Sequence, residues 1–195
     1  MSMNVTISKA PDIPENYYQY VSDILRDAFQ ERTKQGIHFQ CGTFTPEDVK
    51  SYFTKDSEAR YLFIAWDSDR PVGILMTMAR SKGSFKFIRH DYLATIDEYK
   101  GKGVATVLFQ HLLELSRKEK FDFIASVTNP EATSSVKYHV KRGFRICCKN
   151  FNGNSSEYSF IYPIRKFRFL NIFIFQKVIY ATVTGIGYIV NKIRE

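Results

Sequence analysis

The sequence predicts an α+β domain in which a mixed, mostly antiparallel sheet of six or seven strands is flanked by helices. One basis is the order of its segments: a strand, two helices, three strands, a helix, a strand, a helix and two strands. Another is the central strand–helix–strand unit, which implies one parallel pair because the crossover returns the chain in the same direction. A chain of 195 residues is long enough for one domain with a substantial core.

The N-terminal part predicts one strand and two helices. Val5 to Lys9 alternates as a short strand does, and Glu15 to Phe29 places apolar side chains at helical spacing. After a connector over residues 31–44, a second helix begins at Thr45-Pro46-Glu47-Asp48 and runs to about Phe53. Thr45 is expected to cap this helix, because a hydroxyl can accept from the first turn and Pro is favoured at the first helical position.

Three strands and a helix follow. Tyr61 to Trp66 and Val72 to Ala79 form a hairpin around a polar turn, and the third strand, Phe85 to Ile96, comes after a second turn. The next helix opens at the glycine-rich run Lys100 to Ala105 and carries an apolar stripe as far as Leu115.

One more strand–helix pair and a hairpin complete the predicted domain. Phe121 to Val127 is a short apolar run, typical of a central strand. Asn129 is expected to be the N-cap of a helix that begins at Asn129-Pro130-Glu131 and ends at Gly143. Phe144 to Lys149 and Tyr158 to Ile161 form the final hairpin.

A C-terminal extension, residues 164–195, follows the predicted domain of residues 1–163. Its stretch Leu170 to Val190 is almost wholly apolar, and Lys177 is the only charge within it. That charge argues against a membrane span. We expect the extension to pack against protein, either on the domain's own apolar face or on a second copy in a homodimer. The alternative is peripheral contact with the inner face of an anionic membrane, which the basic flanks would favour.

Charge and cysteine content narrow the choice of partner and compartment. The net charge of +8 suggests an anionic partner, but the basic residues are spread over several elements, so nucleic acid is not favoured. Three cysteines, Cys41, Cys147 and Cys148, do not make a disulfide framework, and the adjacent pair is expected to alternate across a strand. Together with an N-terminus that lacks a signal-peptide pattern, this predicts a cytoplasmic protein.

The run Lys100-Gly101-Lys102-Gly103-Val104-Ala105 is the strongest functional signal. It lies between a strand and a helix, where backbone N–H groups are left unpaired and the helix dipole adds partial positive charge. Glycines let a ligand approach the backbone, so the run predicts a site for a pyrophosphate. The alternative is a plain helix entry whose glycines serve close packing.

The arrangement resembles the GNAT acetyltransferases. Their hallmark is Arg or Gln, two variable residues, Gly, one variable residue, then Gly or Ala, and Lys100, Gly103 and Ala105 stand at those positions. A second hallmark, a helix ending in Gly-Phe before a strand, is matched by residues 135–144. The resemblance covers Val5 to about Pro163. It implies direct transfer of an acetyl group from acetyl-CoA, as co-substrate, to a primary amine of a small molecule or amino sugar, without a metal.

The resemblance also implies which residues hold the co-substrate and where the acceptor binds. The first two helices, their connector and the final hairpin would form the acceptor site, with residues 38–41 among its lining. The co-substrate would be held by the end of the third strand, the glycine turn and the start of the following helix, together with a serine of the later helix: Leu93, Ala94, Thr95, Lys100, Gly101, Lys102, Gly103, Val104, Ala105 and Ser135.

Three residues are candidates for catalysis. Asp91 matches the family's acidic general base, with a solvent-facing strand residue as the alternative. His139 stands where many members carry a Tyr near the cofactor sulfur, and Ala132 where many carry Asn. Helical geometry places His139 on the apolar face of its helix and turns Tyr138 about 100° away, which makes Tyr138 the weaker candidate for the acid. A buried core histidine is the alternative for His139. A cofactor-binding module without catalysis and a basic membrane-surface adaptor are the competing functions.

Overall fold

The computed structural model describes residues 3–34, 44–55, 58–152 and 155–165. Within these residues the chain forms seven strands and four α-helices, with one 3-10 turn. In chain order they are β1 (Asn4–Lys9), α1 (Glu15–Lys34), α2 (Pro46–Thr54), β2 (Arg60–Asp67), β3 (Arg70–Lys82), β4 (Phe85–Thr95), η2 (Asp97–Tyr99), α3 (Val104–Lys118), β5 (Phe123–Thr128), α4 (Thr133–Lys141), β6 (Arg145–Asn152) and β7 (Ser155–Pro163).

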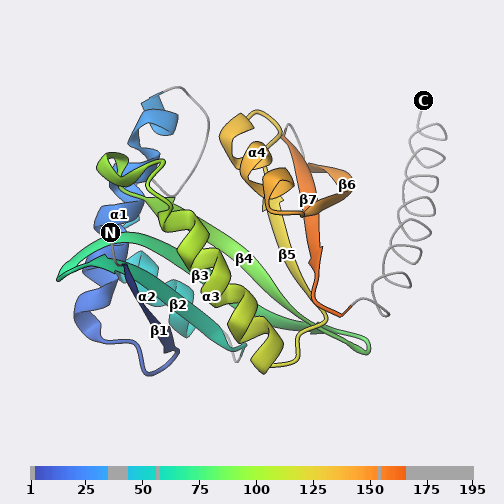
Figure 1. Ribbon diagram of the computed structural model, residues 1–195, viewed down its shortest axis with the longest axis horizontal. Helices are drawn as coiled ribbons and strands as arrows, with labels where there is room; N and C mark the ends of the chain where they lie inside the picture. Colours follow the sequence, from blue (N-terminus) through green and yellow to red (C-terminus); the bar gives the residue numbers. More distant parts are fainter. Residues whose placement is uncertain (1–2, 35–43, 56–57, 153–154, 166–195) are drawn as a thin grey trace.

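The seven strands form one sheet in the order β1-β2-β3-β4-β5-β7-β6 (Figure 1). Every neighbouring pair is antiparallel except β4 and β5, which run parallel on either side of the crossover through α3. The predicted fold class and the single parallel pair are therefore confirmed.

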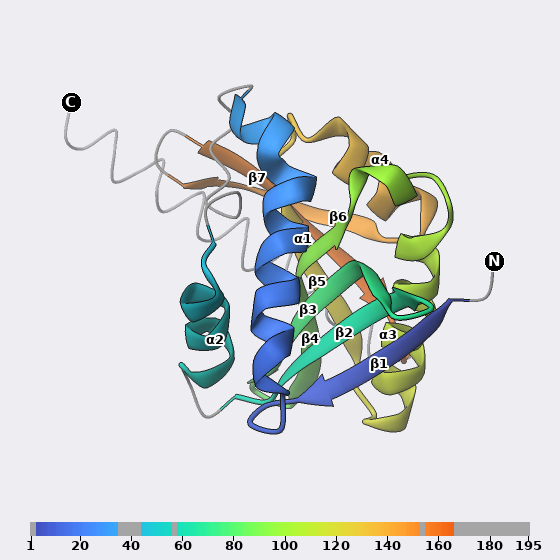
Figure 2. The ribbon, with the colours of Figure 1, turned by 90° about the vertical axis from the view of Figure 1, so that its left-hand side faces the viewer.

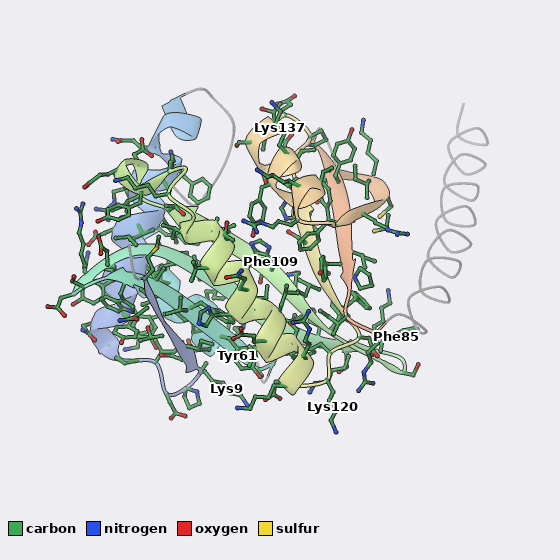
Figure 3. All side chains as sticks on the ribbon, in the orientation of Figure 1. Lys9, Tyr61, Phe85, Phe109, Lys120 and Lys137 are labelled. Carbon is green, nitrogen blue, oxygen red and sulfur yellow. The ribbon has the colours of Figure 1, made fainter. Side chains whose placement is uncertain are left out.

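Helices cover both faces of the sheet, with α1 and α2 on one face and α3 on the other (Figures 1 and 2). The side chains of β2 alternate between the two faces of the sheet, which gives each face an apolar surface for helices to cover. Leu62 and Ile64 belong to the core under α1 and α2, whereas Phe63 and Ala65 belong to the core under α3. On α3, Phe109 lies toward α4 (Figure 3), where its ring contacts those of Tyr138, Phe144 and Tyr162.

Several element boundaries differ from the sequence prediction, most clearly at two helices, and one local motif is confirmed. Thr45 caps α2 as expected, in a capping box with Asp48. The first helix continues past Phe29 to Lys34. The last helix begins only at Thr133, so the prediction that Asn129 is its N-cap is wrong. The Asn129 side chain instead accepts a hydrogen bond from the N–H of Glu131 at 2.8 Å, which forms a turn before the helix.

Most of the C-terminal extension lies outside the described residues, as do residues 38–41 of the connector. Its first two residues are tied to the loop before β5, because the N–H groups of Ile164 and Arg165 both donate to the carbonyl of Asp122. Among the residues that the structure describes, none of the helices is long and apolar enough to span a membrane.

Candidate active site

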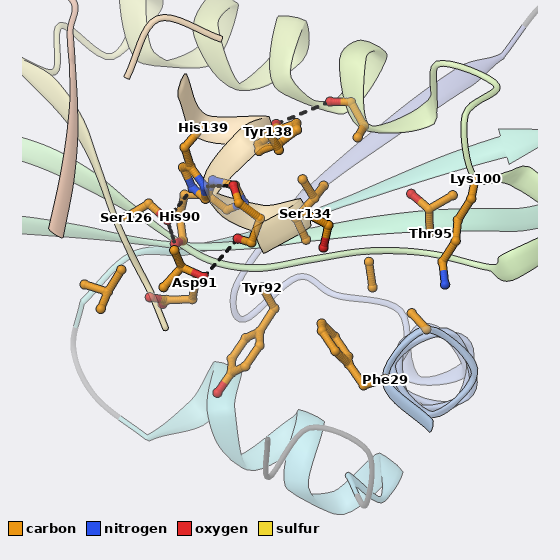
Figure 4. A pocket seen from close by; sticks show the side chains of 17 residues that line it. Phe29, His90, Asp91, Tyr92, Thr95, Lys100, Ser126, Ser134, Tyr138 and His139 are labelled. Carbon is orange, nitrogen blue, oxygen red and sulfur yellow. Dashed lines mark hydrogen bonds between the residues drawn. The ribbon is translucent and has the colours of Figure 1, made fainter. Parts of the chain in front are cut away.

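A cavity opens where β4 and β5 separate. The parallel pairing of these strands ends at His90 and Ser126, while β4 continues to Thr95 beside β3. Between the parted strands lies a cavity of about 600 Å³, which α1, α4 and the glycine turn complete (Figure 4). Its lining residues are Ala28, Phe29, His90, Asp91, Tyr92, Leu93, Ala94, Thr95, Lys100, Ala105, Ser126, Val127, Thr128, Ser134, Ser135, Tyr138 and His139.

The glycine turn presents unpaired donors at one end of this cavity. Gly101 and Gly103 have φ angles of 79° and 90°, and Gly103 is the N-cap of α3. Within the described part of the chain, the N–H groups of Gly101, Gly103, Val104 and Ala105 donate to no protein acceptor. A Cβ at either glycine would meet no atom within 4 Å, so these glycines serve the left-handed backbone and not close packing. The turn therefore fits a phosphate group at a helix N-terminus.

Neighbouring elements hold this turn in place. The start of α3 lies close against β3, because a Cβ at Gly73 would come within 2.4 Å of the Val104 side chain. The Lys100 ammonium forms an ion pair with Asp97 and borders the cavity. The ammonium of Lys102 lies 4.7 Å from the centre of the Tyr99 ring. Both lysines thus add positive charge close to the unpaired N–H groups.

Helix α4 brings both of its central rings to the cavity, so the prediction that Tyr138 turns away is wrong. Tyr138 and His139 both line the cavity, and their rings meet edge to face at 5.3 Å. The reason is that α4 is buried on two sides. Tyr138 faces α3, where its hydroxyl lies 3.5 Å from the Ala105 carbonyl oxygen, whereas His139 stacks on Phe160 of β7. The next residue, Val140, is apolar and yet 55% exposed.

Both ring nitrogens of His139 are engaged with neighbouring groups. Nδ1 lies 2.7 Å from the Ser135 carbonyl, and Nε2 lies 2.9 Å from the Ser126 hydroxyl. A carbonyl only accepts, so Nδ1 carries the proton of the neutral ring and Nε2 accepts from Ser126. The Ser126 hydroxyl also lies 3.2 Å from the His90 carbonyl, and its single proton serves one acceptor at a time. Burial lowers the pKa of His139, although the Ser135 carbonyl partly offsets this effect.

His90 lies fully inside the wall beside His139, with 5.5 Å between the ring centres. Burial, and then the proximity of His139, lower the pKa of His90 to about 3, so its ring is neutral near pH 7. Its Nδ1 atom is buried without a hydrogen-bond partner in the described residues. The deep end of the cavity therefore holds two neutral imidazoles (Figure 4).

Asp91 is held by two neighbours and is not the solvent-facing residue that the sequence left as an alternative. It is an extra residue in β4, because the register with β3 passes directly from His90 to Tyr92. Its side chain is only 9% exposed. One carboxylate oxygen accepts from the Tyr52 hydroxyl of α2 at 2.5 Å, and the other pairs with the guanidinium of Arg89. The bulge thus directs a fixed carboxylate to the cavity.

Comparisons with known proteins identify the family. A model of the acetyltransferase (GNAT) family matches residues 18–144. The chain belongs to this family. No curated protein matches the sequence. Three solved structures similar to this GNAT chain illustrate the fold: the PaiA N-acetyltransferase of Thermoplasma acidophilum in complex with coenzyme A, the ribosomal-protein-S18-alanine N-acetyltransferase of Escherichia coli and the aminoglycoside 6′-acetyltransferase type Ii.

The likeness to these structures extends over most of each chain. The first has 12% identity and a TM-score of 0.64, and the match covers 83% of this chain and 100% of that one. The Escherichia coli enzyme has 14% identity and a TM-score of 0.61, and the match covers 83% of this chain and 95% of that one. The aminoglycoside acetyltransferase has 18% identity and a TM-score of 0.63, and the match covers 82% of this chain and 97% of that one. At such low identity the likeness shows the fold alone.

The GNAT fold brings most of the sequence-predicted site residues to one cavity. The three catalytic candidates lie there with the end of β4, Lys100, Ala105 and Ser135, whose hydroxyl accepts from Thr128 at 2.9 Å. Gly101, Lys102, Gly103 and Val104 lie in the adjoining turn and the start of α3. Sequence reasoning missed Tyr52, Arg89 and Ser126. Ser126 had a visible signal as a polar residue in an apolar strand, but no sequence pattern connects Tyr52 with Asp91.

Proposed function

We propose that this GNAT acetyltransferase transfers an acetyl group from acetyl-CoA to a primary amine of a small molecule or amino sugar. The observation that carries the proposal is the set of unpaired N–H groups at the start of α3, at one end of a cavity that holds a fixed carboxylate at the other. With a pyrophosphate at the N–H groups and an amine at the carboxylate, the thioester would lie between them, in the space between β4 and β5. Such positioning makes the reaction effectively intramolecular.

The donor side would use the backbone of Gly101 to Ala105 for the pyrophosphate, with Lys100 and Lys102 adding charge. Backbone groups of β4 from Leu93 to Thr95 border the cavity without a β5 partner, since the pairing of these strands ends at His90. An N–H from this stretch would donate to the thioester oxygen as negative charge develops on it. Ser135 would hold α4 to β5 through its hydrogen bond with Thr128.

The acceptor side would use Asp91 to attract the amine and to take up its proton, directly or through a water. Arg89 and Tyr52 fix the orientation of the carboxylate. The cavity thus keeps a localised negative charge for a cationic acceptor.

Tyr138 is the better placed of the two acid candidates. Burial raises the pKa of its phenol, so the hydroxyl stays protonated; it would turn from its long contact with the Ala105 carbonyl, at 3.5 Å, to donate to the departing thiolate. His139, with both nitrogens occupied, would act as a positioning residue that orients Ser126 and the Tyr138 ring.

The test is release of the CoA thiol from acetyl-CoA across a panel of amino sugars, polyamines, amino acids and short peptides. We expect a small primary amine to accelerate release, and Asp91→Asn to abolish most of that acceleration. Asp69→Asn, an exposed acid in the turn between β2 and β3, is the matched control and should behave as the parent protein. Acceleration by peptides alone would overturn the acceptor class. Calorimetry that detects no acetyl-CoA binding would overturn the proposal as a whole.

We also propose that residues 1–163 form the catalytic domain and that residues 164–195 pack on protein. Truncation after Pro163 should lower the melting temperature or the oligomeric state measured by size-exclusion chromatography. Flotation of the full chain with anionic vesicles, lost on truncation, would instead favour the membrane alternative.

A further inference from the structure

Two adjacent thiols lie together on β6, outside the cavity of the active site. Cys147 and Cys148 have sulfur atoms 3.9 Å apart, and neither is in a disulfide. The sequence prediction that they alternate across the strand is therefore wrong. The register explains why: Ile146 pairs with Phe160 and Cys148 with Ser159, so Cys147 is the extra residue of a β-bulge. A bulge interrupts the alternation of side chains, and both sulfurs lie on the same side.

The spacing of the sulfurs suits a bridging atom better than a direct bond. A disulfide needs sulfurs about 2.05 Å apart and Cα atoms at least about 4.4 Å apart. Adjacent residues have Cα atoms about 3.8 Å apart across a trans peptide bond, so a bond between these two would be strained. One atom bound to both sulfurs through bonds of about 2.3 Å separates them by about 3.4 Å in a pyramidal centre and about 3.8 Å in a tetrahedral one. The thiols of Cys147 and Cys148, at 3.9 Å, thus need only a small movement to bind one such centre together.

The surroundings favour a soft, weakly hydrated ligand. Cys147 is half-buried, packs against Phe123 and Ile161, and donates from its thiol to the Ser159 carbonyl at 3.3 Å. Its hydrogen bond with Cys148, followed by burial, raises the pKa of the Cys147 thiol. Among the described residues, no group of three or more His, Cys, Asp or Glu side chains could hold a metal ion. The described part of the chain therefore does not build a closed four-ligand zinc site.

We propose that Cys147 and Cys148 form a dithiol site that binds one soft thiophilic centre, of the class of trivalent arsenic. With an arsenoxide the reaction forms two As–S bonds, and the oxygen leaves as water with the two thiol protons, so no oxidant is needed. Thiolates select soft centres of this kind over hard cations. The second sulfur binds intramolecularly, which makes retention by the pair about 10²- to 10⁴-fold stronger than retention by one thiol.

The test uses phenylarsine oxide on the reduced full-length chain, in an excess of glutathione that removes adducts held by one sulfur. Intact-protein mass spectrometry should show one arsenical per chain, and titration of thiols should show the loss of two. Cys147→Ser and Cys148→Ser should each reduce retention at least about 100-fold, whereas Cys41→Ser, which keeps the pair, should retain the arsenical fully. A small dithiol should release it.

Three results would overturn the site: no retention by the parent chain, full retention by either single variant, or loss of retention in Cys41→Ser. Circular dichroism establishes that each variant is folded. If a serine variant does not fold, peptide mapping of the adduct on the parent chain replaces it, and an adduct outside the peptide with residues 147–148 refutes the proposal. All these readouts are independent of acetyl transfer, so their failure is distinct from failure of the proposed function.

Discussion

Replacing Gly103 with Ala tests whether the turn before α3 holds the pyrophosphate. The residue has a φ of 90°, and an added Cβ would meet no atom within 4 Å, so the change adds backbone strain without a clash. A left-handed conformation costs a non-glycine residue about 1–2 kcal/mol. For a chain of this size we expect a fall in melting temperature of about 2–8 °C. Relaxation of the strained turn would also move the unpaired N–H groups out of alignment.

Gly83→Ala is the matched control for this variant. Gly83 has a φ of 59° with nothing within 4 Å of an added Cβ, and it lies in the β3–β4 turn, outside the cavity lining. Both variants should therefore lose similar stability. Only Gly103→Ala should weaken acetyl-CoA binding, because losing one charge-assisted hydrogen bond costs about 1.5–3 kcal/mol, or about 10- to 150-fold in Kd.

Differential scanning calorimetry and isothermal titration with acetyl-CoA measure the two effects on the same protein samples. If Gly103→Ala binds acetyl-CoA as tightly as Gly83→Ala does, the turn does not hold the pyrophosphate. If both variants lose affinity equally, the loss reflects general destabilisation, and the argument from unpaired N–H groups fails.

Three further predictions concern the deep end of the cavity. Asp91→Asn should lower kcat about 10²- to 10⁴-fold if Asp91 is the base. Tyr52→Phe should lower kcat less, because it removes only the hydroxyl that donates to the carboxylate at 2.5 Å and keeps the ion pair with Arg89. Equal effects of the two variants in steady-state kinetics would contradict this order. Tyr138→Phe should lower kcat with little change in melting temperature, and an unchanged kcat would remove Tyr138 as the acid. His90 has a folded-state pKa of about 3 against about 6.5 when unfolded, so the unfolded state binds more protons between these values and stability falls as pH drops through this window. His90→Gln should flatten the slope of unfolding free energy against pH by up to about 1.4 kcal/mol per pH unit, and an unchanged slope in urea titrations would show that His90 is not the cause.

Much of the fold could be predicted because its signals are local. The alternation of Val5 to Lys9, the apolar stripe ending at Leu115 and the cap at Thr45 each lie within one element, and each corresponds to the observed element. The same is true of the glycine turn, where two positive φ angles at Gly101 and Gly103 require the residues that the sequence shows.

Local patterns gave the wrong answer where burial came from two directions or where a strand gained a residue. A helical wheel assumes one buried face, but α4 contacts α3 on one side and the sheet on another, so Tyr138 and His139 both reach the cavity. Period-2 alternation assumes a regular strand, but bulges at Asp91 and Cys147 break it. No periodicity within either strand marks these insertions, because a bulge is defined by the register with the neighbouring strand.

The sequence by itself determined the order of elements, the glycine turn before α3 and the resemblance to the family, because each depends on residues close together in the chain. Only the tertiary structure decided how the chemistry is arranged: Asp91 held by Tyr52 of α2, 39 residues away, and Ser126 placed against His139. Each of these contacts joins a strand to a helix, and its partners are set by strand register and helix packing. The physical reason is that register and packing are properties of pairs of elements, which a pattern along one segment does not contain.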